Sequence, residues 1–342
     1  MSSRGATLGV SIALAVGLGV GGSQLPVPYV GLGPGPIYNT LGSTGGKQLI
    51  QVPPERDHPA SGELNLTTVN VYPDLKLGEA VAKWFDRSFA VVPREVIYPP
   101  GQTEQQADED TREEMRQSQQ HAVTAALCEL NTPVVGTVEI DSVGDGSPAD
   151  QAGLRPGDVV TAIDGRAVDS VCRLRRLMRA QRAGAVVRVG YRRGSTPATA
   201  VVQTRAGETG PDGAPLIGVG LVETGQRPPF TVTIALNDVG GPSAGLMFAL
   251  GIYDRLTRGD LTGGQVIAGT GSIDDDGQVG AIGGIQQKLV AAKEHGARFF
   301  LTPDGNFDDA SAAKPDGLTL VRVRTLREAI EAVRAIAAGR TP

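Results

Sequence analysis

Apolar and polar residues alternate over residues 63–72 (ELNLTTVNVY), where β-branched side chains are frequent. This period of two predicts a strand. A short helix is expected over 77–85, and a long helix over 104–130 starts with acidic residues that suit the positive end of a helix dipole. We therefore expect an N-terminal α/β region over 26–130, in which the glycine- and proline-rich residues 31–46 form a tether.

The C-terminal part of the chain shows a second pattern, which begins after a linker-like stretch over 206–215. Strands and helices are expected to alternate there. The expected strands cover 231–236, 265–270, 298–302 and 319–323, and the expected helices cover 243–256, 285–296 and 326–338. Such alternation predicts an α/β domain over 215–340 with helices packed on a sheet. The whole chain is thus expected to be a multi-domain α/β (α+β) protein.

The N-terminus carries the longest apolar run. No charged residue occurs over 6–30, and Arg4 stands just before this segment. The run predicts an uncleaved, single-pass transmembrane anchor over 6–25, with a cleaved signal peptide and a buried core helix as alternatives. Positive residues favour the cytoplasmic side, so the chain after Leu25 is expected outside the cytoplasm, at the cell membrane.

Composition limits the function classes. A chain of 342 residues suggests two or three domains. The net charge of −5 disfavours nucleic acid as a partner, because phosphate binding needs positive charge. The P-loop pattern GxxxxGK[ST] is absent from the sequence, which gives no indication of an ATP site.

The cysteines and histidines restrict the chemistry further. Two cysteines, Cys128 and Cys172, are too few for a disulfide scaffold, although one bridge between them is possible outside the cytosol. The three histidines are far apart in sequence, and no HExxH pattern occurs. We therefore expect neither a metal site nor a cofactor.

Residues 146–160 (GSPADQAGLRPGDVV) predict a one-turn helix capped near Ser147, followed by a Pro-Gly turn and a strand. With the following IDG at 163–165, the run resembles the bacterial PDZ domain. The resemblance sets this domain at 131–206. It implies that an extended peptide adds as a strand beside a helix over 171–183. The peptide-binding residues expected on this basis are Val135, Gly136 and Val138.

The segment 240–245 (GGPSAG) places Ser243 at the start of a helix, flanked by small residues that let a substrate backbone approach its hydroxyl. Unpaired N–H groups at a helix start can stabilise an oxyanion. The oxyanion loop is therefore expected at Gly241, Pro242 and Ala244. A plain helix-capping serine is the alternative, and the motif alone does not decide between them.

Ser243 also fits the pattern GxSxG, but an α/β-hydrolase needs an acid and then a histidine after the serine. Only His295 follows, inside an expected helix, so a lysine is the natural base. Lys288 stands at the edge of the apolar side of the helix over 285–296. Burial would lower the pKa of its amine. The alternative is a lysine that extends its amine into water.

The stretch 230–292 resembles the proteolytic domain of Lon proteases, peptidase family S16. The matching residues lie at 241–245 (GPSAG), 269–271 (GTG) and 283–289 (GGIQQKL). The resemblance implies a Ser–Lys dyad with Ser243 as nucleophile and Lys288 as general base, and a Thr270 that orients Lys288. The sequence departs from the family at Gly240, where many Lon proteases carry an aspartate.

The order of anchor, PDZ-like domain and Lon-type domain resembles membrane-anchored bacterial Lon-like proteases. This resemblance implies an ATP-independent serine endopeptidase that cleaves unfolded or extended segments outside the cytoplasmic membrane. Its expected partners are protein or peptide substrates and the membrane, and a homo-oligomer is one possibility. Two alternatives are a catalytically inactive PDZ-type binding protein with a Lon-like shell, and a Ser–Lys hydrolase of other esters or amides.

Overall fold

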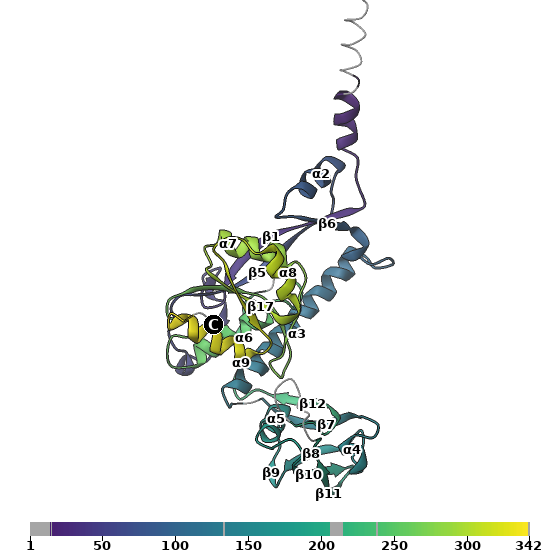
Figure 1. The fold of residues 1–342 in the computed structure, drawn as a ribbon, viewed down its shortest axis with the longest axis vertical. Helices are drawn as coiled ribbons and strands as arrows, with labels where there is room; N and C mark the ends of the chain where they lie inside the picture. The colour runs from purple at the N-terminus through teal and green to yellow at the C-terminus, as the bar shows by residue number, and fades with distance from the viewer. Residues whose placement is uncertain (1–13, 15, 133, 206–214, 237–238, 341–342) are drawn as a thin grey trace, which may run out of the picture.

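The computed structural model describes residues 14, 16–132, 134–205, 215–236 and 239–340. Two folded parts lie along the long axis of the molecule (Figure 1). The larger part is built on the sheet that contains β1, β5 and β17, and the smaller part contains β7–β12. The N-terminal helical segment projects from the end of the larger part that is remote from the smaller one.

The larger part contains a six-stranded sheet of order β18-β17-β14-β5-β1-β6. Its strands are β18 (Thr319–Val323), β17 (Phe299–Pro303), β14 (Val266–Gly269), β5 (Glu63–Tyr72), β1 (Tyr29–Asn39) and β6 (Ala90–Pro93). The first four are parallel, and β1 is antiparallel to β5 and to β6. The segments 26–130 and 215–340, expected as separate regions, thus share one sheet, because β5 hydrogen-bonds directly to β14.

The expectation of a tether over 31–46 was wrong for its first half. Residues 31–39 belong to β1, an interior strand of this sheet. Its glycines permit close contacts across the sheet. A Cβ on Gly33 would overlap the ring of Phe89, and one on Gly35 would overlap Thr68 Oγ1. The glycines therefore reflect packing rather than a flexible connection.

Helices cover both faces of the sheet. One face carries α3 (Glu104–Glu129), α6 (Gly245–Leu256) and α9 (Leu326–Ala337), and the other carries α7 (Ile285–Glu294) and α8 (Phe307–Ala313). Successive strand residues point to opposite faces. On β17, Phe300 accordingly joins the core under α7 and α8, whereas Leu301 joins the core under α6 and α9. The predicted alternation of strands and helices is confirmed.

The smaller part has its own sheet and core. Its elements are β7 (Val135–Val143), α4 (Pro148–Gln151), β8 (Val159–Ile163), β9 (Arg166–Ala167), α5 (Val171–Arg179), β10 (Val186–Arg193), β11 (Thr196–Gln203) and β12 (Val219–Arg227). The strand order is β11-β10-β8-β7-β12, with β9 on β8. The expected boundaries at 206 and 215 differ from this arrangement, because β12 pairs with β7 and belongs to the smaller part.

Short elements complete the larger part. They are α2 (Leu77–Phe85), the two-residue pairs β2 (Ser43–Thr44) with β3 (Lys47–Gln48), β4 (Ile50–Gln51) with β13 (Thr233–Ile234), and β15 (Ser272–Ile273) with β16 (Val279–Gly280), and the 3-10 turns η1 (Pro54–Arg56), η2 (Arg94–Val96) and η3 (Asp304–Asn306). The strand expected over 231–236 is therefore shorter than its pattern indicated.

A disulfide joins the two parts. Cys128 near the end of α3 is bonded to Cys172 in α5. Beside it, Arg176 donates a hydrogen bond of 3.1 Å to the carbonyl of Cys128. Arg175 forms an ion pair of 2.7 Å with Asp276, in the turn between β15 and β16. The bridge that the sequence left open is thus present, and it lies at the junction of the two parts.

Within the described ranges, no helix has both the length and the apolar character needed to cross a bilayer. Residues 6–13 and 15 of the anchor expected over 6–25 lie outside the described residues.

Candidate active site

Ser243 lies in the turn that leads into α6. Gly241 in this turn has a φ of +83°, which favours glycine. A Cβ on Gly240 would lie 2.8 Å from Thr111 Oγ1, and a Cβ on Gly245 would lie 2.8 Å from Ser118 Oγ. The glycines around Ser243 therefore let the turn pack closely on α3, and the contact with Thr111 leaves little room for a side chain at position 240.

The end of β14 holds the Ser243 backbone in place. The Gly271 amide donates a hydrogen bond of 2.9 Å to the Ser243 carbonyl, and Thr270 Oγ1 donates one of 3.0 Å to the same oxygen. Thr270 is fully buried, and its own amide bonds to the Leu301 carbonyl of β17. Ser243 is thus fixed to the carboxyl end of a central strand.

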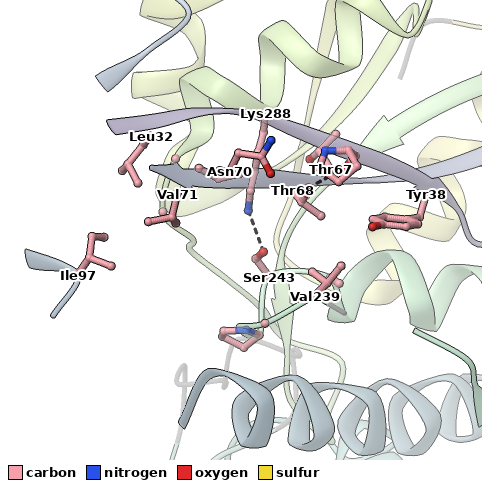
Figure 2. Close-up of a pocket in the computed structure, with 17 residues that line it drawn as sticks. Leu32, Tyr38, Thr67, Thr68, Asn70, Val71, Ile97, Val239, Ser243 and Lys288 are labelled. Atoms are coloured by element: carbon pink, nitrogen blue, oxygen red, sulfur yellow. Dashed lines mark hydrogen bonds between the residues drawn. The ribbon is translucent and has the colours of Figure 1, made fainter. Parts of the chain in front are cut away.

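Lys288 approaches Ser243 from α7, on the opposite side of the cleft. Its Nζ lies 2.8 Å from Ser243 Oγ and 3.1 Å from Thr270 Oγ1 (Figure 2). The side chain is 2% exposed, and this burial lowers the pKa of its amine to about 7. Its place on the first turn of α7 adds the positive end of that helix, which also disfavours a charged amine. Sequence alone placed Lys288 only at the edge of an apolar face.

The histidines lie in other environments. His121 Nδ1 is 2.7 Å from Asp275 Oδ1, and His295 Nε2 is 3.5 Å from Glu63. Among the contacts of the described residues, none joins a histidine to Ser243. The local geometry therefore brings together a hydroxyl and an amine whose pKa is lowered to about 7, the combination required for a serine nucleophile with a lysine base.

Comparison with known proteins assigns families to the two parts. Residues 237–335 match the Lon protease (S16) C-terminal proteolytic domain, and residues 139–193 match a PDZ domain. Residues 237–335 are thus similar to a Lon-type proteolytic domain and residues 139–193 to a PDZ domain, and we call the two parts the Lon-type domain and the PDZ domain. The matches support a serine peptidase of family S16.

Individual relatives match these segments. Lon protease 2 of Bacillus subtilis is 33% identical over 95 residues, which are 28% of this chain and 17% of the relative. The archaeal Lon protease of Methanocaldococcus jannaschii is 35% identical over 95 residues, 28% of this chain and 14% of the relative. The solved PDZ domain of an SdrC-like protein from Listeria monocytogenes is 32% identical and covers 25% of this chain and 86% of that chain, with a TM-score of 0.22. The chain thus spans less than a fifth of the two Lon relatives.

The backbone amides of the expected oxyanion loop differ in whether they are free to bind an oxyanion. The Gly241 amide is engaged, because it donates a hydrogen bond of 2.7 Å to the Thr111 carbonyl. Pro242 has no N–H group. Among the hydrogen bonds of the described residues, none uses the amides of Ser243 or Ala244. These two amides, at the amino end of α6, are the available donors in the loop.

An open cleft of about 380 Å³ leads to the Ser243–Lys288 pair. Figure 2 shows side chains of β1 and β5 along it, with Thr68 and Asn70 close to the pair and Tyr38 towards one end. Residues from the 26–130 region thus line the candidate active site together with residues of the Lon-type domain. Their contribution was missed in the sequence, where the threonines of 63–72 indicated only a strand.

Helix α3 also supports the site, which the sequence did not indicate. Ser118 is buried and donates a hydrogen bond of 2.9 Å from its Oγ to the Pro242 carbonyl. The Thr111 carbonyl accepts from the Gly241 amide, so α3 binds the backbone on both sides of the Gly241–Pro242 peptide bond. From the sequence, the acidic start of 104–130 indicated a helix face in contact with water. The opposite face, which packs on the turn that carries Ser243, is seen only in the tertiary structure.

The peptide-binding residues expected in the PDZ domain lie on an interior strand of its sheet. Val135, Gly136 and Val138 belong to β7, which pairs with β12 on one side and with β8 on the other. Added strands need an open edge. The outer strands of the described sheet are β11 and β12, and a groove of about 360 Å³ lies between β12 and α5. The sequence missed β12 because it lies beyond the segment that resembles a PDZ domain.

Proposed function

We propose that the protein is an ATP-independent serine endopeptidase in which Ser243 is the nucleophile and Lys288 the general base. The observation that carries the proposal is the 2.8 Å contact between Lys288 Nζ and Ser243 Oγ, made by an amine that is 2% exposed. An amine with a pKa of about 7 is largely neutral just above that pH and can accept the serine proton.

The proposed reaction proceeds in two steps. Neutral Lys288 takes the proton of Ser243 as Oγ bonds to the scissile carbonyl carbon, and the amides of Ser243 and Ala244 stabilise the oxyanion. The lysine ammonium then gives its proton to the leaving amine as the C–N bond breaks, which leaves an acyl-enzyme. Water, deprotonated by Lys288, attacks the ester, and the proton returns to Ser243 as the acid product leaves.

Thr270 has a positioning role in this proposal. Its hydroxyl donates to the Ser243 carbonyl and accepts a hydrogen bond from Lys288 Nζ. One fully buried group therefore sets both partners of the dyad relative to each other. This arrangement keeps the lysine amine directed at Ser243 Oγ during both steps.

The proposed substrates are unfolded or extended protein segments. An open cleft beside β5 suits an extended chain, and the PDZ groove beside β12 is suited to a peptide that adds as a strand. The PDZ domain would then select or present the segment that is cleaved.

The proposed location is outside the cytoplasm, with residues 6–25 as a membrane anchor. The apolar, uncharged sequence of this segment supports the proposal. The Cys128–Cys172 disulfide supports it as well, since disulfides persist in oxidising compartments. Protease added to intact spheroplasts should degrade the chain after Leu25; protection until the membrane is broken would contradict this location.

Peptidase activity is tested with the full chain in mild detergent and unfolded casein without ATP. Ser243→Ala and Lys288→Ala should abolish cleavage and leave the circular dichroism spectrum unchanged. Ser311→Ala on the exposed side of α8 is the matched control and should cleave normally. A wild-type protein that binds peptides but cleaves nothing would favour the inactive binding protein, and cleavage of esters alone would favour the other hydrolase.

A further inference from the structure

The described end of the N-terminal segment has no protein surface around it. It is helical over 16–23, and Val16, Leu18 and Val20 are all exposed. The preceding residues 6–13 contain no charge. A helix with exposed large apolar side chains on several sides is suited to an apolar solvent.

Helix α2 is attached directly to the end of this segment. The Leu77 amide donates a hydrogen bond of 2.8 Å to the Leu25 carbonyl, and the Val27 amide donates one of 3.1 Å to the Leu75 carbonyl. Lys76 Nζ adds a bond of 2.8 Å to Gln24 Oε1. Figure 1 shows α2 next to the N-terminal helix, at the end of the molecule opposite the PDZ domain.

The free side of α2 is apolar and ends in two aromatic residues. Trp84 is 69% exposed and Phe85 is 83% exposed. With Leu77, Val81 and residues of β1 and β6 they line a shallow apolar groove of about 280 Å³. Exposure of two large aromatic rings on one short helix is unusual for a surface in contact with water.

The basic residue within this helix is directed away from the aromatic tip. Lys83 Nζ lies 4.2 Å from the ring centre of Tyr72 and 3.6 Å from that of Phe89, two rings beside the sheet. The Lys83 charge is thus held against aromatic faces on the protein side. The Trp84 and Phe85 rings themselves carry no charge, and the charged Asp86 and Arg87 follow them only after the end of α2.

We propose that α2 is an interfacial helix, which inserts Trp84 and Phe85 into the boundary between lipid headgroups and acyl chains. The inference rests on the proposed membrane anchor, because the anchor would bring α2 to that depth. Tryptophan and phenylalanine favour this boundary, where one side is apolar and the other wet. Two attachment points, the anchor and α2, would then fix the end of the Lon-type domain that faces the bilayer.

The test uses the intrinsic fluorescence of the full chain, because Trp84 is the only tryptophan in the sequence. The protein is reconstituted into phosphatidylcholine vesicles with and without bromine on the upper acyl chain. We expect a blue-shifted emission, loss of emission with brominated lipid, and protection from aqueous iodide. Phe85→Asp should reverse all three changes while peptidase activity on a soluble peptide stays unchanged.

The matched control moves the tryptophan to the PDZ domain. Val201 is 61% exposed on β11, so Val201→Trp in a Trp84→Phe background should remain sensitive to iodide and unaffected by brominated lipid.

Vesicle-bound protein whose Trp84 is quenched by iodide alone would overturn the interfacial helix and leave the anchor intact. Protein that fails to bind vesicles would overturn both. Shielding of Trp84 that grows with protein concentration in detergent would instead indicate a contact between two copies. Peptidase activity of the wild-type protein is measured separately with the soluble peptide, so that failure of the proposed function is distinguished from failure of the interfacial helix.

Discussion

Cys128 of α3 and Cys172 of α5 form a disulfide. It links the helix that packs on residues 240–244, the turn with the proposed nucleophile Ser243 (the nucleophile turn), to the helix beside the PDZ groove. The same α3 contacts the nucleophile turn through Thr111 and Ser118. A single helix therefore connects the attachment point of the PDZ domain with the turn that carries Ser243. The disulfide restricts how far the two domains can separate.

We predict that Cys128→Ser with Cys172→Ser lowers the free energy of unfolding. The bridge closes a loop of 44 residues, for which the chain-entropy relation gives about 4 kcal/mol. Denaturant unfolding with and without a reductant measures this difference. The double variant should be insensitive to reductant, and equal midpoints for oxidised and reduced wild type would contradict the prediction.

We predict that peptide cleavage rises with pH through about 7, the pKa of Lys288. Only the neutral amine accepts the serine proton, so kcat/KM at pH 5 should be roughly 100-fold below its plateau. His121 is the second titratable group to be tested, since its hydrogen bond to Asp275 raises its pKa. The variant His121→Asn is therefore the control and should keep the wild-type midpoint; a midpoint that moves with His121 would reject Lys288 as the group observed.

Lys288 should also affect stability, with a sign that follows from its depressed pKa. Below about pH 7 the folded protein must bury a charged amine, whereas the unfolded chain keeps it in water. Between about 7 and the usual 10.5 the unfolded state binds more protons, so stability rises with pH across this window. Lys288→Met removes this dependence.

The measurement compares the free energies of unfolding of wild type and Lys288→Met at pH 6 and pH 10. The free energy of unfolding of Lys288→Met should exceed that of wild type at pH 6, and this difference should become smaller by about 3–5 kcal/mol at pH 10. Lys293→Met, on the exposed side of the same helix, should show no such change. Parallel curves for wild type and Lys288→Met would mean that the amine is not desolvated in the folded protein.

Local patterns were sufficient to predict several elements. The strand over 63–72 and the helix over 77–85 have the expected ends in the structure. Their patterns are strong because each element has one buried side and its own terminating residues. Strand β1 was missed because Gly33 and Pro34 disfavour strands locally, while contacts with Phe89 and β5 stabilise it.

The site shows a similar division. The residues Ser243, Thr270 and Lys288 stood out through their chemistry and through a family resemblance, and the structure brings them together. The contribution of α3 could not be predicted in this way. Ser118 is an ordinary serine within a polar helix, and its role depends on a carbonyl 124 positions away in the sequence.

Thr270→Val tests the positioning of the dyad. The substitution keeps the size of the side chain and removes the hydroxyl that bonds to Lys288 Nζ and to the Ser243 carbonyl. We expect kcat to fall about tenfold or more with little change in KM, since a hydrogen bond to a reacting group is worth about 1.5 kcal/mol. Thr302→Val, at a buried threonine of β17 that bonds within its own strand, should leave kcat unchanged.

Ser118→Ala tests the support of the nucleophile turn by α3. The hydroxyl is buried, and its loss leaves the Pro242 carbonyl without this partner, so the turn should gain freedom. Because small displacements of a nucleophile lower the rate of attack, we expect a loss in kcat of about tenfold with KM and the pH midpoint near 7 retained. Reaction with a fluorophosphonate, which reports on Ser243 alone, should slow by the same factor. A variant that unfolds at lower denaturant yet reacts at the wild-type rate would show that Ser118 stabilises the fold without positioning Ser243.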